Sequence, residues 1–183
     1  MAVSMLIKNT KNHYGIVAIS LHWIMAILII GLLVLGLYMV PLPISREKLK
    51  LYRWHKEFGM VVLMLVVLRA AWRLSNIIPS LASLPPWEKF AARSVHYAFY
   101  VFMFAIPISG WIMSSAAGFS VSFFGLFLLP DLVLPDENLR IILTEIHKWL
   151  SYLLIAIIFL HISASLKHHY INKDDILRRM LWP

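Results

Sequence analysis

Four long apolar segments constrain this chain more than any other feature of its sequence. They cover approximately residues 15–40, 51–73, 90–113 and 143–168. A bilayer has a hydrocarbon core of roughly 30 Å, which a helix crosses with about 20 residues. Each segment reaches that length, so the sequence predicts four membrane-spanning helices.

The composition supports this reading, because 61% of the 183 residues are hydrophobic and only 14% are charged. Buried helices of a soluble core are the alternative, but they need amphipathic neighbours, and little polar sequence remains to form them. We therefore expect an all-α fold: an integral membrane four-helix bundle with up-down-up-down topology, formed by one domain over residues 1–183.

Basic residues beside the spans predict the orientation. Four spans place both termini and the loop between spans two and three on one side of the membrane. Ten of the 17 Lys and Arg residues fall on that side, namely Lys8, Lys11, Arg69, Arg73, Lys89, Arg93, Lys167, Lys173, Arg178 and Arg179. The positive-inside rule then predicts cytoplasmic termini. The net charge of +8 indicates anchoring to membrane lipid and not nucleic-acid binding, because these residues lie at helix ends.

The connection over residues 114–140 is the longest, and it mixes aromatic, Gly and Pro residues with Asp131, Asp136 and Glu137. It is too interrupted to span the membrane and too apolar for a free linker. We expect a loop or short helix that lies at the outer interface and caps the bundle.

The absence of cysteine excludes disulfides, thiolate-bound iron–sulfur clusters and covalently attached haem. Any redox cofactor would therefore depend on histidine. The chain has eight of these residues: His13, His22, His55, His96, His147, His161, His168 and His169.

Four of the histidines sort into two pairs by depth. His22 and His161 lie about 9 and 8 Å inside the cytoplasmic ends of the first and fourth spans, given a rise of about 1.5 Å per residue. His55 and His147 open the second and fourth spans on the outer side. His147 and His161 also share one helix face, because fourteen residues make nearly four turns, with a rise of about 21 Å.

Paired imidazoles favour two b-type haems over metal ions. Zinc needs further ligands, but Glu57 and Glu145 are offset by two residues from His55 and His147 and face elsewhere. Haem iron needs only two axial ligands, and its ring fits an apolar cleft between helices. A single histidine near a helix end is commonly just an interfacial residue, and a proton or ion transporter with a histidine relay is the less favoured alternative.

Other basic residues are candidates for haem propionates or a quinone site. His96 lies at the level of His22 and His161, and a supporting role is favoured over a ligand role, although both stay open. The further candidates, which interfacial anchoring explains equally well, are Arg69, Arg73, Lys167, His168 and His169.

Five motifs resemble the bacterial cytochrome b561 family in their order and spacing. They are "AISLHW", "WHKEFGMVVLMLVVLRAAWRL", "AIPISGWIM", "EIHKWL" and "LHISASLKHHYINKDDILRRM", and together they extend over about residues 15–180. The resemblance implies a multi-pass protein of the bacterial inner membrane with two non-covalent b haems between its helices. It implies that His22 and His161 ligate the cytoplasmic-side haem iron, and that His55 and His147 ligate the periplasmic-side haem iron.

The resemblance also implies electron transfer across or within the membrane, between the quinone pool (ubiquinone or another quinone) and a periplasmic-side donor or acceptor. Whether the chain is itself a quinone-linked oxidoreductase stays open. A haem b anchor subunit that docks a soluble dehydrogenase is the alternative. We expect a monomer or homodimer.

Overall fold

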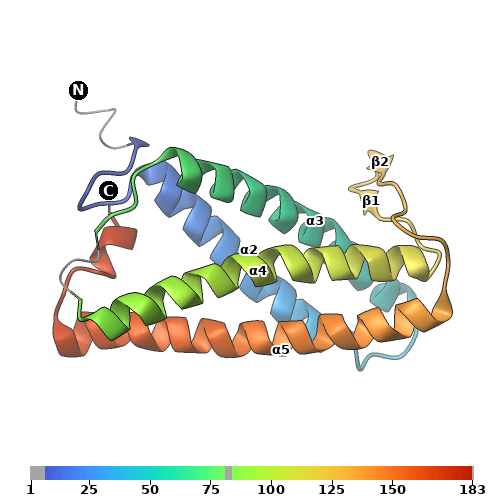
Figure 1. Cartoon of the computed structure of the whole chain (residues 1–183). Helices are drawn as coiled ribbons and strands as arrows, with labels where there is room; N and C mark the ends of the chain where they lie inside the picture. The colour runs from blue at the N-terminus through green and yellow to red at the C-terminus, as the bar shows by residue number, and fades with distance from the viewer. Residues whose placement is uncertain (1–6, 81–83, 183) are drawn as a thin grey trace. The chain divides into compact units, whose positions relative to one another are not determined.

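The computed structural model describes residues 7–80 and 84–182, in which four long helices predominate (Figure 1). The helices are α2 (Ile16–Met39), α3 (Arg46–Ser75), α4 (Pro86–Ala116) and α5 (Glu137–Lys167). All four are long and apolar enough to cross a membrane. A π-helical turn, His168–Asn172, and a 3-10 turn, Arg178–Met180, follow α5. The predicted all-α, four-helix membrane fold is confirmed.

Three helices begin earlier than the apolar segments predicted. The side chain of Ser45 accepts the N–H of Lys48 at 3.1 Å ahead of α3, and that of Asp136 accepts the N–H of Leu139 at 3.0 Å ahead of α5. α4 begins at Pro86, a residue suited to the first helical position. The polar caps of α3 and α5, and Pro86 in α4, start each helix before its apolar part, and hydropathy detects only the latter.

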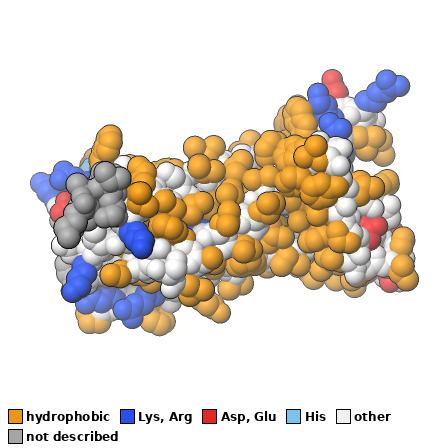
Figure 2. Space-filling model, turned by 90° about the horizontal axis from the view of Figure 1, so that it is seen from above, with side chains coloured by type: hydrophobic (Ala, Val, Ile, Leu, Met, Phe, Trp, Pro, Cys, Tyr) orange, Lys and Arg blue, Asp and Glu red, His pale blue; other side chains and the backbone are white. Residues whose placement is uncertain are grey.

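The helices expose apolar side chains to their surroundings. Ile27 of α2 and Phe159 of α5 are 70% and 71% exposed. On the face drawn in Figure 2, hydrophobic side chains cover most of the surface. So large an apolar surface fits lipid and not water.

Of the two forms expected for the third connection, the structure has the loop. α4 ends at Ala116, and two residues later Gly118 has φ of 75° and donates its N–H to the Ser115 carbonyl at 2.8 Å. A short hairpin follows, in which β1 (Ser122–Phe123) pairs antiparallel with β2 (Phe127–Leu128). The left-handed glycine terminates the helix, as is common at such ends.

The residues group into two compact units, to which each long helix contributes. The first unit comprises residues 1–26, 65–100 and 156–183, and the second comprises residues 27–64 and 101–155. The first contains His22, His96 and His161. The second contains His55 and His147.

Candidate functional site

The first unit brings together three imidazoles from three helices. The ring centroids of His22 in α2 and His161 in α5 are 6.3 Å apart, with the ring planes inclined by 64°. The ring of His96 in α4 lies 5.8 Å from that of His161, and Phe99 lies edge-on to His161 at 5.2 Å. The two histidines that depth had paired are therefore neighbours in space, and His96 joins them.

The second unit brings together the other predicted pair. The ring centroids of His55 in α3 and His147 in α5 are 6.2 Å apart, and their planes are inclined by 72°. Residues 92 positions apart in sequence are thus juxtaposed by helix packing.

The spacing within each pair suits one iron atom between two imidazoles. A metal–imidazole bond is about 2.0 Å long, and a ring built from bonds of about 1.33 Å has its centre about 1.1 Å from each nitrogen. Two rings that direct a nitrogen at one metal therefore have centroids about 6.2 Å apart. The pairs measure 6.3 and 6.2 Å, whereas the 5.8 Å between His96 and His161 is tighter. The spacing of both pairs fits bis-histidine binding of haem iron.

His147 is oriented by hydrogen bonds at its other nitrogen. Its Nδ1 lies 3.0 Å from the Ile106 carbonyl oxygen and 3.0 Å from the Ser109 hydroxyl. A carbonyl only accepts, so Nδ1 carries the proton and donates, and Nε2 keeps a free lone pair. Metal-bound histidines are held in this way. Ser109 and Ile106 were not predicted from the sequence, although a serine inside an apolar segment is a signal for such a contact.

Two glycines allow close approach to the second pair. A Cβ on Gly110 would lie 3.1 Å from Cε1 of His147, and one on Gly36 would lie 3.4 Å from Cε1 of His55. A side chain at Gly110 would therefore compete with the imidazole for space. Small residues let helices approach closely inside membranes, and these two were also missed.

His55 carries an orphaned atom. Its Nδ1 is buried and has no hydrogen-bond partner within the described part of the chain. Buried nitrogens without partners are rare in folded proteins. This unpartnered atom therefore fits a site that holds more than the polypeptide.

Arg69 of α3 lies beside His22, where its Nη2 is 3.2 Å from Nδ1 of the imidazole. Arginine only donates, so Nδ1 accepts in this arrangement and Nε2 carries the proton. An iron ligand needs a free lone pair on its nitrogen. Binding through Nε2 of His22 therefore requires Arg69 to release Nδ1, which would free the guanidinium for an anionic partner.

The second predicted arginine, Arg73, has its guanidinium 5.8 Å from the centre of the Tyr100 ring. Tyr14, just before α2, lies within electrostatic reach of Arg73 and Arg69. Burial raises the pKa of the Tyr14 hydroxyl above its ordinary value of 10.0, while the nearby arginines oppose that shift. Both predicted arginines are thus half-buried and lie in the first unit.

The basic residue that ends α5 and the two histidines that follow it have different surroundings. Lys167 Nζ donates to Oε1 of Glu88 at 2.8 Å, and His168 Nδ1 lies 2.6 Å from Oδ2 of Asp174. These two side chains are thus already engaged by carboxylates. His169 instead lines a pocket near the chain termini, where its Nδ1 is buried without a partner in the described residues.

Comparison with known proteins identifies the family of the chain. The prokaryotic cytochrome b561 family matches residues 13–183. Cytochrome b561 homolog 2 of Escherichia coli (strain K12) is 37% identical, over 94% of this chain and 93% of the relative. Cytochrome b561 homolog 1 of the same organism is 31% identical over 93% and 97%, and the probable superoxide oxidase CybB of Yersinia pestis is 27% identical over 92% and 95%. The chain therefore belongs to the prokaryotic cytochrome b561 family and is a bacterial membrane cytochrome of the b type that functions in electron transfer.

Proposed function

We propose that the chain binds two haem b groups and carries electrons between the quinone pool and a donor or acceptor on the periplasmic side of the inner membrane. The observation that carries this proposal is the pair of matched imidazole spacings, 6.3 Å in the first unit and 6.2 Å in the second. Both termini are cytoplasmic in this proposal, as the distribution of basic residues predicts.

In this assignment His22 and His161 hold the cytoplasmic-side haem, and His55 and His147 hold the periplasmic-side haem. Bound haem b supplies a one-electron carrier whose potential the protein adjusts. The hydrogen bond from His147 to Ile106 keeps the ligand nitrogen unprotonated and fixes the ring. The apolar helices exclude water, and Arg69 favours the reduced form through its positive charge.

Arg69, Arg73 and His96 are the proposed partners for propionates or a quinone head group in the first unit. Arginine suits this role because its planar donors match a carboxylate. Lys167 and His168 stay candidates, but each would first have to exchange the carboxylate that it now contacts.

A reduced-minus-oxidised spectrum with haem counted per chain tests the proposal. We expect two b haems in the wild type and one in either His22→Gln or His55→Gln, because each substitution removes one axial ligand. His13→Gln is the matched control, since this histidine lies on the exposed leader. A colourless protein, or one that keeps both haems in both ligand variants, would contradict the proposal.

A second experiment tests which molecule donates electrons to the protein. The name of the Yersinia pestis relative suggests superoxide, an anion that positive charge would attract. Arg53 and Lys56 flank His55 in sequence, and Lys56 Nζ donates to Ser114 Oγ at 3.1 Å. Two superoxide ions would each lose one electron to give O2, and one quinone would take both electrons with two protons to give quinol. Enzymatically generated superoxide should then reduce ubiquinone in proteoliposomes, and more slowly with Lys56→Gln than with wild type.

A further inference from the structure

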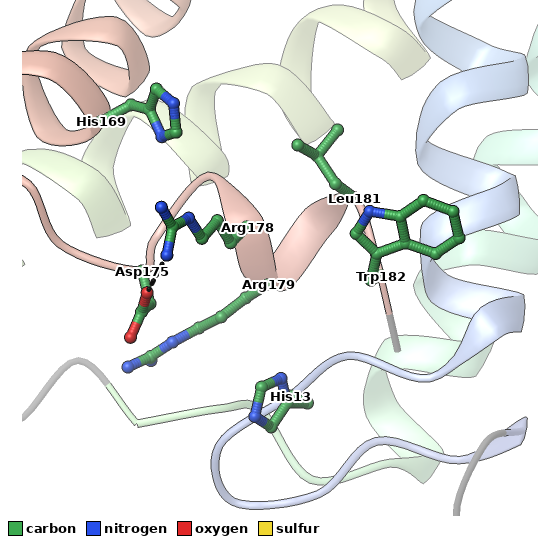
Figure 3. Close-up of a pocket in the computed structure, with 7 residues that line it drawn as sticks. All are labelled: His13, His169, Asp175, Arg178, Arg179, Leu181 and Trp182. Atoms are coloured by element: carbon green, nitrogen blue, oxygen red, sulfur yellow. Dashed lines mark ion pairs between the residues drawn. The ribbon is translucent and has the colours of Figure 1, made fainter.

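A basic pocket lies between the N-terminal leader and the C-terminal segment, and the haem proposal does not use it. Its volume is about 440 Å³, and all its lining residues belong to the first unit. Figure 3 shows the lining residues His13, His169, Asp175, Arg178, Arg179, Leu181 and Trp182.

The charged side chains of the pocket favour the binding of an anion with a single negative charge. Arg178 and Arg179 contribute two positive charges, and Asp175 contributes one negative charge. Arg178 Nη1 lies 3.6 Å from Asp175 Oδ1, with both side chains exposed, and Arg179 Nη1 donates to the Ser80 carbonyl at 2.9 Å. A guanidinium has five N–H donors, so these contacts leave donors available. The guanidinium and carboxylate groups together carry one net positive charge, which a monoanion would balance.

Donor geometry narrows the class of anion. Arginine binds phosphate oxygens with paired N–H groups, and imidazole nitrogens add single hydrogen bonds. His169 lines the pocket, and its buried Nδ1 has no partner in the described residues. A phosphodiester carries the single charge and the several acceptor oxygens that these donors need.

The surroundings indicate where such a phosphate would come from. Leu181 and Trp182 lie next to the arginines and are 44% and 77% exposed. Tryptophan is enriched at membrane interfaces, where basic residues attract anionic head groups. Most of the residues that line the pocket follow the apolar helix α5 in the chain. If α5 spans the membrane, the exposed apolar side chains of the pocket lie near the bilayer surface.

We propose that this pocket binds a phosphate-class anion, supplied by the head group of an anionic phospholipid. The guanidinium groups hold the phosphate oxygens, and Leu181 and Trp182 contact the glycerol and the start of the acyl chains. The proposal does not rest on the redox assignment, because none of its residues ligates haem in that scheme.

Native mass spectrometry of the full-length haem-loaded protein in nonionic detergent tests this site. We expect dioleoylphosphatidylglycerol to bind more tightly than dioleoylphosphatidylcholine, and Arg178→Gln to weaken the former about fivefold, as expected for one basic residue near an anionic lipid. Arg178→Lys, which keeps the charge, should retain part of the affinity. Arg93→Gln is the matched control, because it removes an exposed charge from the same unit without touching the pocket.

Inorganic phosphate forms the second arm, with the thermal unfolding temperature as readout. If phosphate stabilises the wild type but not Arg178→Gln, and phosphatidylglycerol shows no preference, the anion site stands and its source is soluble phosphate. The pocket is not an anion site if Arg178→Gln binds phosphatidylglycerol as tightly as the wild type and phosphate does not change the unfolding temperature. The same conclusion follows if Arg93→Gln loses as much affinity for phosphatidylglycerol as Arg178→Gln. The haem spectrum of each variant is recorded in parallel, so a failure of the redox proposal is distinguishable.

Discussion

Nδ1 of His147 lies 3.0 Å from the carbonyl oxygen of Ile106, and the Ser109 hydroxyl lies equally close to the same nitrogen. Ser109→Ala removes the hydroxyl but leaves the carbonyl, so the proton stays on Nδ1 while the ring is held less firmly. We expect both haems to remain and the periplasmic-side haem to bind about tenfold more weakly, the lower end of the range for such supporting residues. Haem titration of the apoprotein measures this, with Ser163→Ala on the exposed face of α5 as control. Equal affinities in the two variants would contradict the supporting role.

A glycine series tests the approach of helices α2 and α4 to the second imidazole pair. Gly110→Val should abolish the periplasmic-side haem, because even a Cβ there would lie 3.1 Å from the His147 ring. Gly36→Ala should cost less, since its Cβ would meet His55 at 3.4 Å. Gly59→Ala has open space and is the control. Haem per chain should therefore be lowest in Gly110→Val, higher in Gly36→Ala and highest in Gly59→Ala. If Gly59→Ala loses as much haem as Gly110→Val, the substitutions disrupt the fold in general.

His96 and His22 compete for the role of second ligand beside His161. The 6.3 Å spacing of His22 from His161 suits a shared iron better than the 5.8 Å of His96. We expect His22→Gln to lose the cytoplasmic-side haem, and His96→Gln to retain it with an unchanged bis-histidine signal in electron paramagnetic resonance. The reverse pattern would make His96 the ligand.

Arg69 should raise the reduction potential of the cytoplasmic-side haem. Arg69→Gln removes a positive charge beside His22, which favours the oxidised form, and we expect the midpoint potential to fall by on the order of 50 mV. Arg93→Gln, an exposed charge on α4, should shift it much less. A redox titration followed at the haem absorption band checks both variants. A potential that stays constant in Arg69→Gln would mean that the guanidinium lies elsewhere once haem is bound.

Tyr14 gives a pH dependence outside the membrane spans. Burial raises the pKa of its hydroxyl in the folded chain above the ordinary value of 10.0, so the unfolded chain loses this proton first. The stability that it contributes is therefore present below pH 10 and declines as the pH rises through the folded-state value. Thermal unfolding should show a smaller loss between pH 9 and 11 for Tyr14→Phe than for wild type. Parallel curves for the two proteins would exclude this contribution.

Helix number and type were predictable because lipid requires a long apolar run for each span. The positions of the helix ends were less predictable. α3 begins at Arg46 and α5 at Glu137, and their capping residues, Ser45 and Asp136, lie in polar sequence. Hydropathy contains no information on such caps. The hairpin at residues 122–128 was likewise not foreseen, because its pairing depends on the positive φ values of Phe124 and Gly125.

The sequence by itself determined the membrane class, the absence of thiol ligands and the position of each histidine along its span, because these depend only on composition and on the regular rise of a helix. Depth was enough to pair His22 with His161 and His55 with His147 as neighbours. Only the tertiary structure placed Arg69 beside His22. It also placed Ile106 and Ser109 at Nδ1 of His147, and Gly110 close to Cε1 of the same ring. Those contacts join residues far apart in sequence, and they depend on the rotation of each helix about its axis, which the nearly uniform hydrophobicity of a membrane span leaves unspecified.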